Sequence, residues 1–332
     1  MKRNYYITRN GRLKRQDNTL SLKFESGERK AIPIEDVEGI YLLAETDLNT
    51  KLLNFLSQQK IPVHIFNYYG YYSGSYYPRE HLNSGFILVN QVEAYKNAEI
   101  RLNIAKEFIK SATHNILCNL RYYKNRDIEV EKYMNDINLI LPKIEESQDI
   151  LSLMAWEGHV RERYYDSFNS ILKLENENKF TKRNKRPPDN IINALLSFGN
   201  SLLYATTLGE IYHTQLNPTI SFLHEPGNRR FSLSLDISEI FKPIIVDHVI
   251  FKLINTNMLG ERDFEKDVNF CYLSESGRKI FLREYDDRLN TTIKHRNLGR
   301  NVSYRHLIRL ECYKLEKQIS GIEEYKAFRA WW

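Results

Sequence analysis

Three short stretches of the 332-residue sequence place polar side chains in apolar surroundings, where they could support chemistry. Glu157 lies within Leu-Met-Ala-Trp-Glu-Gly-His-Val, and His224 follows the largely apolar Ile-Ser-Phe-Leu. Asp236 and Glu239 are three residues apart, so on a helix they share one face. Carboxylates in such surroundings are costly unless they are paired or bind a metal. Two carboxylates and an imidazole suit a divalent ion such as Mn²⁺ or Mg²⁺, and the nitrogen ligand favours Mn²⁺.

Each of these residues also has a purely structural interpretation. Glu157 could pair with Arg161, which follows four residues later on the same helix face. His224 could be a hydrogen-bonded core or turn residue, because histidine serves many roles. Asp236 and Glu239 could form a solvated helix face. The pattern of residues alone therefore leaves both a metal site and structural pairing open.

Other familiar catalytic patterns are absent from the sequence. No GxGxxG or GxxxxGK[ST] segment occurs, so no nucleotide-binding fold is indicated. His224-Glu225 begins like a zinc-protease HExxH motif, but Pro226 would break the helix and Asn228 replaces the second histidine. No serine or cysteine has the surroundings of a nucleophile elbow.

Basic residues gather in two segments, 179–186 and 291–318, with few acidic residues among them. Such density is typical of contacts to DNA phosphates, although a solvated helix face has the same composition. The candidate DNA-binding residues are Lys182, Arg183, Lys185, Arg186, Lys294, Arg296, Arg300 and Arg305.

A run of tyrosines lies between Tyr68 and Tyr77 and contains six of the 22 tyrosines of the chain. Tyrosine rings could stack on nucleobases. Aromatic residues at a strand edge more often pack in a core or a dimer interface, and we favour that interpretation.

The elements that must position these residues differ between the two ends of the chain. Short apolar runs at 5–8, 21–24, 31–34, 40–43 and 63–66 predict strands, and one helix is expected over 48–56 with Thr46 or Asp47 as its N-cap. Beyond Gly85, periodic apolar residues predict three long helices. The first spans 94–122, and the second runs from an N-cap at Ser147 to residue 168. The third follows Pro187-Pro188, with Asp189 or Asn190 as its N-cap. Residues 235–330 are also mostly helical by pattern. We therefore predict an α+β fold: a β-rich domain over 1–88 and a larger all-α domain over 89–332.

Composition narrows the class of protein. The chain is 42% hydrophobic and 27% charged with a net charge of +6, which excludes a disordered or low-complexity chain. Its three cysteines are odd in number and widely spaced, so a disulfide framework is not expected and a reducing cytoplasm is favoured. The first 16 residues carry no apolar segment of the secretory type and no 18-residue apolar run occurs, so neither secretion nor a membrane span is expected.

Four motifs, in order along the chain, resemble those of the CRISPR-associated adaptation nucleases, the Cas-one integrase family. The first is Glu157-Gly158 followed by Arg161, and the second is Arg-Pro-Pro-Asp at 186–189 leading to Asn-Ala-Leu-Leu-Ser-Phe-Gly at 193–199. The third is Phe-Leu-His-Glu at 222–225 with Asp-Ile-Ser-Glu at 236–239 and Phe-Lys-Pro at 241–243. The fourth is Leu-Ser-Glu-Ser-Gly-Arg at 273–278 with Ser-Tyr-Arg at 303–305. Ser221 and Asn200 depart from the family pattern, which often has glycine and an aromatic residue there.

The resemblance implies an enzyme that inserts short DNA fragments, the spacers, into a CRISPR repeat array by strand transfer from a 3′-hydroxyl to a repeat phosphodiester. Family members bind a divalent metal, Mn²⁺ or Mg²⁺, through residues that correspond to Glu157, His224 and Glu239, with Asp236 adjacent. Lys242, one turn beyond Glu239, could neutralise charge in the transition state.

The resemblance further implies double-stranded DNA as substrate, a homodimer formed through the β domains, a small Cas-two partner and, in some lineages, a Cas-four-like nuclease. Two alternatives remain: a structure-selective DNase that acts on branched DNA in repair, and a DNA-binding scaffold whose acids are structural pairs. We expect loss of any one metal ligand to lower strand transfer by orders of magnitude and to leave DNA binding largely intact. Stability should hold or rise, because clustered acids repel one another without the ion.

Overall fold

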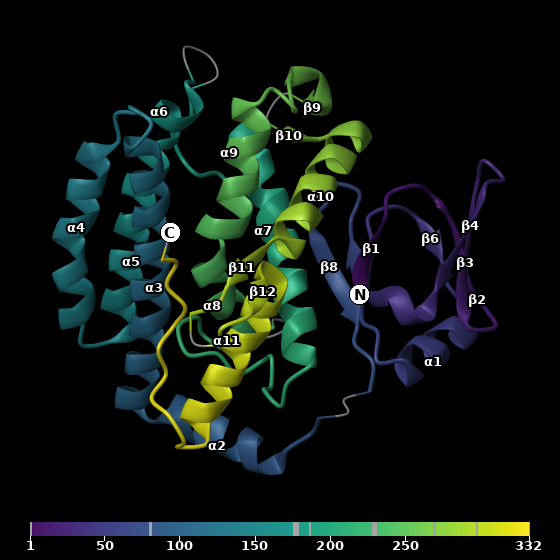
Figure 1. The fold of residues 1–332 in the computed structure, drawn as a ribbon, viewed down its shortest axis with the longest axis horizontal. Helices are drawn as coiled ribbons and strands as arrows, with labels where there is room; N and C mark the ends of the chain where they lie inside the picture. The colour runs from purple at the N-terminus through teal and green to yellow at the C-terminus, as the bar shows by residue number, and fades with distance from the viewer. Residues whose placement is uncertain are drawn as a thin grey trace.

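Two four-stranded sheets form the N-terminal part of the computed structural model, which describes residues 2–79, 82–174, 179–185, 187–227, 231–267, 270–296 and 298–331 (Figure 1). The first sheet has the order β1-β5-β7-β8, with β1, β5 and β7 parallel and β8 antiparallel. The second has the order β4-β3-β2-β6. The strands are β1 Arg3–Ile7, β2 Gly11–Gln16, β3 Thr19–Phe24, β4 Arg29–Pro33, β5 Val37–Leu42, β6 Thr46–Asp47, β7 Val63–Phe66 and β8 Tyr72–Tyr76, with helix α1 Thr50–Gln58 before β7.

The rest of the chain is mainly helical. Its helices are α2 Gly85–Lys96, α3 Ala98–Lys124, α4 Glu131–Glu146, α5 Ile150–Asp166, α6 Phe168–Leu172, α7 Ile191–Tyr212, α8 Ser232–Phe241, a π-helical turn η3 Pro243–Asp247, α9 His248–Asn255, α10 Glu275–Asn290 and α11 Tyr304–Ile319. Two antiparallel hairpins interrupt them, formed by β9 Phe264–Asp267 with β10 Phe270–Leu273 and by β11 Thr292–Lys294 with β12 Asn301–Ser303.

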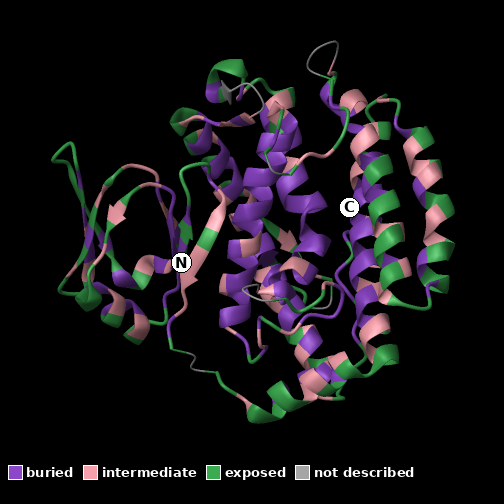
Figure 2. Cartoon of the chain, turned by 180° about the vertical axis from the view of Figure 1, so that it is seen from behind, coloured by how far each residue is buried: buried purple, intermediate pink, exposed green. Residues whose placement is uncertain are grey.

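Helix α7 is the central helix of the core. Nineteen of its residues are buried, and Figure 2 shows the buried residues concentrated in the helices at the middle of the molecule. By length and composition α7 could cross a membrane, but 83% of its most apolar window is buried inside the protein, so its apolar character is that of a core helix. Gly199 permits its close packing, because a Cβ there would lie 2.6 Å from Val246 Cγ1 and 2.9 Å from Phe281 Cζ.

The first sheet is joined to the helices by side chains from its central strands. Tyr41 and Phe66 belong to the same apolar cluster as the helical core, whereas the opposite side of the sheet belongs to a second cluster with α1. The Tyr41 hydroxyl donates to Thr206 Oγ1 at 3.2 Å, and Thr206 in turn contacts the Tyr285 hydroxyl at 2.9 Å. The sheet is therefore packed on both faces, as parallel strands usually are.

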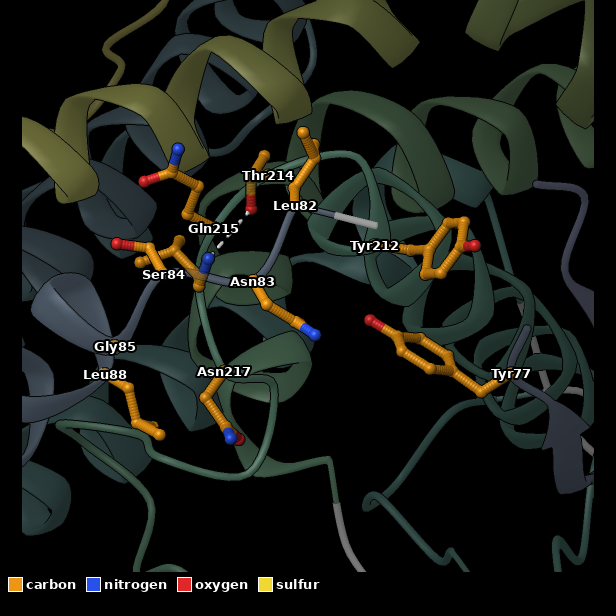
Figure 3. Close-up of a pocket in the computed structure, with 11 residues that line it drawn as sticks. Tyr77, Leu82, Asn83, Ser84, Gly85, Leu88, Tyr212, Thr214, Gln215 and Asn217 are labelled. Atoms are coloured by element: carbon orange, nitrogen blue, oxygen red, sulfur yellow. Dashed lines mark hydrogen bonds between the residues drawn. The ribbon is translucent and has the colours of Figure 1, made fainter. Parts of the chain in front are cut away.

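A small cavity marks the junction between the sheets and the helices (Figure 3). Its volume is about 280 Å³, and the rings of Tyr77 and Tyr212 meet edge to face with centroids 4.8 Å apart on one side of it. The lining residues that the structure describes include no acidic or basic side chain. Among the described residues, this cavity therefore offers no carboxylate, imidazole or amine for acid–base or metal chemistry.

The predicted α+β fold is confirmed, but several element boundaries were wrong. Strands β2, β6 and β8 and both late hairpins were not predicted. Strand β2 has a single apolar residue, Leu13, and β8 has a Ser-Gly-Ser centre, whereas β6 and the hairpin strands have only two to four residues. The predicted long helix is divided at Asn97, whose side chain accepts from the backbone N–H groups of Glu99 and Ile100 and starts α3 anew. The N-cap of α1 is Asn49 and that of α5 is Asp149, whereas Asn190 caps α7 as expected. The boundary at residue 88 and the assignment of 1–88 as a dimerisation domain stay predictions, although residue 88 lies within α2.

Candidate active site

The metal-ligand candidates from three separate stretches line one cavity of about 610 Å³. Glu157 comes from α5, Glu239 and the following Lys242 come from the end of α8, and His224 comes from the loop before α8. The segment 180–185 and one side of α7 complete the wall. The structure thus brings together residues that are up to 85 positions apart in the sequence, counted from 157 to 242.

Glu157 is held by α5, which starts where Asp149 accepts a hydrogen bond of 2.7 Å from Ser152 N–H. The Glu157 side chain is 27% exposed and faces the cavity. The next residue, Gly158, also lines the cavity, and a Cβ there would meet no atom within 4 Å. The chain is therefore open beside Glu157, where a ligand could approach.

Arg161 bridges the two carboxylates. Its Nε lies 3.2 Å from Glu157 Oε1, and its Nη2 lies 2.5 Å from Glu239 Oε2. Lys242 Nζ pairs with the other oxygen of Glu239. Burial raises the pKa of the Glu239 carboxyl, but Lys242 and Arg161 outweigh it, so the pKa falls below its usual range. Glu239 is therefore an ionised carboxylate between two buried cations.

Asp236 organises the loop that carries His224. Its Oδ2 accepts from the N–H groups of Phe222 at 2.7 Å and Leu223 at 2.9 Å, and its Oδ1 accepts from His224 N–H at 3.0 Å. The same Oδ1 lies 2.8 Å from His224 Nδ1. An Nδ1–H that donates to Asp236 leaves Nε2 as the ring nitrogen that carries the lone pair.

The pKa of His224 follows from this arrangement. Burial lowers the pKa of the imidazole, but the hydrogen bond and the charge of Asp236 outweigh burial, so the pKa is raised. Asp236 itself is fully buried. Its role in the structure is to position His224 and the backbone around it.

The predicted DNA-binding residues fall into different environments. Lys182, Arg183 and Lys185 line the cavity of the metal-ligand candidates. Arg183, however, donates to Asn193 Oδ1 at 3.0 Å and Ser197 Oγ at 2.9 Å, which fixes it against α7. Arg186 lies outside the described residues.

The four candidates from the second basic segment lie elsewhere. Lys294 lines a separate groove, Arg296 lies over the Trp331 ring at 5.2 Å, and Arg300 is exposed. Arg305 is only 8% exposed and donates to Lys2 O at 2.9 Å. Arg305 therefore holds the N-terminal segment in place, and its burial does not suit a contact with a DNA phosphate.

Comparisons with known proteins identify the family of the chain. The family model "CRISPR associated protein Cas1" matches residues 5–287. The chain belongs to the Cas1 family. The CRISPR-associated endonuclease Cas1 3 of Thermodesulfovibrio yellowstonii is 56% identical over 99% of this chain and 100% of its own length. The solved structure of a Cas1 protein from Thermotoga maritima has 41% identity and a TM-score of 0.87, with 98% of this chain and 99% of that one covered.

Two more distant structures share the fold. A casposase bound to integration product has a TM-score of 0.86 at 23% identity, with 97% of this chain and 92% of that one covered. A Cas6-RT-Cas1–Cas2 complex has a TM-score of 0.85 at 19% identity, with 99% of this chain and 36% of that one covered. These two structures show the shared fold, and the relatives named as endonucleases place this Cas1-family chain among nucleases.

The donor set of the cavity fits a divalent metal, although the described residues hold no preformed cluster of three His, Cys, Asp or Glu ligands. Arg161 and Lys242 occupy oxygens of Glu157 and Glu239 in this arrangement. A second observation supports a polar occupant: Asn200 Oδ1 is buried in the cavity wall and has no hydrogen-bond partner. A buried acceptor without a partner is costly, so its presence favours a ligand with donors or positive charge.

Sequence reasoning missed three features of this site. The i+4 spacing of Glu157 and Arg161 was read as an alternative to the metal site, whereas Arg161 serves both carboxylates at once. Asn200 was noted only as a departure from the family pattern, yet it lines the cavity. The three backbone bonds of Asp236 had no signal in the sequence, because their donors lie 12–14 residues away.

Proposed function

We propose that this Cas1-family chain is a metal-dependent DNA integrase that joins the 3′ ends of spacer fragments to a CRISPR repeat array. The observation that carries the proposal is the convergence of Glu157, His224 and Glu239 on one cavity. Lys182 and Lys185 on the rim of the same cavity offer positive charge for a DNA backbone. This combination suits a reaction at a phosphodiester.

The reaction exchanges one phosphodiester for another. The oxygen of a fragment's 3′-hydroxyl forms a bond to the repeat phosphorus, the bond from that phosphorus to the repeat's own 3′-oxygen breaks, and the proton of the attacking hydroxyl ends on the departing oxygen or in solvent. Because the number of phosphodiesters is unchanged, no nucleotide cofactor is needed. A divalent ion would supply Lewis acidity that polarises the phosphoryl oxygen and acidifies the attacking hydroxyl.

Residues of this chain would bind the ion, orient the His224 ring and place positive charge beside the phosphate. Glu157, Glu239 and His224 would hold the ion, and Asp236 keeps the His224 ring in one orientation through the 2.8 Å contact to Nδ1. Lys242, whose Nζ pairs with Glu239, would place positive charge beside the phosphate. Burial and the charges of Lys242 and Arg183 lower the pKa of Lys185, which indicates a strongly positive rim.

The test uses purified chain, Mn²⁺, a supercoiled plasmid that carries the repeat and a fragment with 3′-hydroxyl ends. Joined product is scored on a gel, and DNA affinity is measured in parallel. The same fragment with 3′-deoxy ends separates transfer from hydrolysis, because water can still cut the plasmid but the fragment cannot be joined. Glu157→Ala and His224→Ala are expected to lower joining by orders of magnitude with DNA affinity largely retained. His159→Ala is the matched control, since this exposed histidine is on α5 and contacts only neighbours on that helix, Glu162 and the ring of Trp156, among the described residues.

The outcomes distinguish the alternatives. Joining by His224→Ala at the parent rate would contradict the metal assignment and favour a DNA-binding scaffold. Nicking that needs Mn²⁺ and proceeds equally with 3′-deoxy fragments, without joined product, would favour the structure-selective DNase.

The proposed assembly is a homodimer through the N-terminal sheets that works on double-stranded DNA with a Cas2 partner. The named complex in the comparisons contains Cas1 and Cas2 together, which supports that partner. A Cas4-like nuclease stays a prediction from the family resemblance. Co-purification of this chain with Cas2 of the same genome, followed by sedimentation, tests the assembly, and a failure of the two to associate would contradict it.

A further inference from the structure

A second large groove lies apart from the active-site cavity. Its volume is about 960 Å³, and it is lined by the C-terminal end of α3, by α9, by the end of α10, by β11 and by the chain close to the C-terminus. Figure 1 shows α3, α9, β11 and the C-terminal segment beside one another around the label C. The groove and the active-site cavity have no lining residue in common.

Side chains of α3 and α5 separate the two sites. Asn119 of the groove donates at 3.0 Å to the hydroxyl of Tyr164 and at 2.8 Å to Pro243 O. Tyr164 is fully buried and lies one turn from Arg161, which lines the active-site cavity. The groove and the active-site cavity therefore lie on opposite sides of the segments that carry Tyr164 and Pro243, close to the catalytic candidates.

The groove is strongly basic. Five cationic side chains line it and none of its described lining residues is acidic; the cations are Arg121, Arg126, Lys252, Arg288 and Lys294. Lys252 is paired with Glu284 from α10, which neutralises part of this charge. Burial and the positive charges of Arg288 and Lys252 together lower the pKa of His248 to about 4. This imidazole is therefore neutral near pH 7 and does not add to the charge of the groove.

Arg288 is fixed at the wall of the groove. Its Nε donates to Ile244 O at 2.8 Å, and its guanidinium lies 4.0 Å from the centre of the Tyr304 ring. A guanidinium held in this way loses little freedom when it binds an anion. Lys294 is exposed at the mouth, where a second phosphate could be reached.

Aromatic rings alternate with these cations. Tyr122 is 48% exposed, with Arg126 over its ring at 3.6 Å, and it meets Tyr123 edge to face at 5.1 Å. Trp331 and Tyr304 line the groove as well. Tyr304 is only 2% exposed, so Tyr122 and the partly exposed Trp331 are the rings that a ligand could reach. Accessible rings beside recessed cations are the features with which proteins stack unpaired bases and hold the backbone between them.

We propose that this groove is a second DNA site and that it binds a single strand. A duplex about 20 Å wide rests on open surfaces and cannot bring its phosphates to a recessed residue such as Arg288, nor its paired bases to Tyr122. An unpaired strand can do both, because its bases are free to stack and its backbone is flexible. The inference goes beyond the proposed integrase activity and does not depend on a metal.

The test measures fluorescence anisotropy of labelled fifteen-nucleotide oligothymidine in EDTA, with the full chain. Arg121→Gln/Lys294→Gln is compared with Lys14→Gln/Lys23→Gln, which removes the same charge from exposed positions of β2 and β3. The groove variant is expected to weaken single-strand binding and to make the slope of log affinity against log salt shallower by about 1.4, from about 0.7 per lost contact. Binding to a duplex of equal length should be unchanged.

A third variant tests stacking without a change of charge. Tyr122→Ala is expected to weaken single-strand binding at least about five-fold, with a parent-like circular dichroism spectrum and melting temperature. An oligonucleotide that carries 5-iodouracil should crosslink to Tyr122 or Trp331. Equal losses in the groove and control variants, or crosslinks only to the active-site cavity, would overturn the proposal.

Discussion

Replacement of Asp236 by Asn separates a positioning role from a ligand role. Asp236 is fully buried and accepts four hydrogen bonds, three from the backbone of residues 222–224 and one from the imidazole of His224. Asn has nearly the same shape but only one accepting oxygen. In either orientation its NH₂ group faces donors that the carboxylate now satisfies. The substitution should therefore loosen the loop that carries His224 even when no metal is present.

The magnitude follows from the number of bonds that are lost. Oδ2 alone serves two N–H donors, at 2.7 and 2.9 Å, and each bond to a charged group contributes about 1.5–3 kcal/mol. Two lost bonds make the expected cost roughly 3–6 kcal/mol. At roughly 2 °C per kcal/mol for a chain of this size, the melting temperature should fall by about 6–12 °C.

The assay is thermal unfolding followed by circular dichroism in EDTA, so that no ion contributes. Asp149→Asn is the matched control, because Asn caps a helix as well as Asp does and the 2.7 Å bond from Ser152 N–H can be kept. The control should melt within about 1 °C of the parent, which corresponds to a few tenths of a kcal/mol. If Asp236→Asn melts with the parent in EDTA, the positioning role is wrong and Asp236 acts mainly through a bound ion.

Three further predictions follow from the structure. Lys182→Gln/Lys185→Gln should weaken binding to all duplex sequences alike and make the salt slope shallower by about 1.8, at about 0.9 per contact; an unchanged slope would exclude phosphate contacts by this rim. Burial raises the pKa of Asp247 to about 7, so the folded chain loses stability as the pH rises toward and through that value, and Asp247→Asn should raise the urea midpoint at pH 8 more than at pH 5. A uniform gain at both pH values would refute that reasoning. The full chain should sediment as a dimer at tens of micromolar, with intermolecular lysine crosslinks confined to the N-terminal sheets, and a monomer would contradict the dimer.

The helices were predictable where a long apolar period is bounded by a strong cap. Helix α7 is the clear case, since Asn190 follows a pair of prolines and nearly every turn of the helix is buried. The break at Asn97 was missed because asparagine is only a moderate signal within a periodic run, and its effect depends on a side chain that caps the next helix. The hairpins 264–273 and 292–303 were missed because strands of three or four residues carry too little alternation to be recognised.

The members of the site were identified by resemblance, and their contacts came from the fold. Spacing within one helix indicated the pair Glu157–Arg161 correctly, at 3.2 Å. Spacing could not indicate the contact of Arg161 with Glu239, because 78 residues separate the two. They meet only in the folded chain, in which α5 and α8 both pack against α3. Long-range contacts of this kind are not encoded in local periodicity, which is why a sequence pattern predicts a helix face better than its partner.

The pairing of Glu239 changes what its removal would mean. We expected stability to hold or rise when any metal ligand is removed, because clustered acids repel one another. Glu239 is instead 5% exposed between Arg161 and Lys242, so Glu239→Ala would leave two buried cations without their partner. Breaking a buried pair in this way costs about 3–5 kcal/mol, and loss of activity in that variant would reflect damage to the fold as well as to the site. Glu157 is 27% exposed and shares only one contact with Arg161. Removal of the His224 imidazole takes one partner from Asp236 but leaves its three backbone N–H donors in place. Glu157 and His224 are therefore the positions at which lost joining with an unchanged melting temperature would identify a metal ligand.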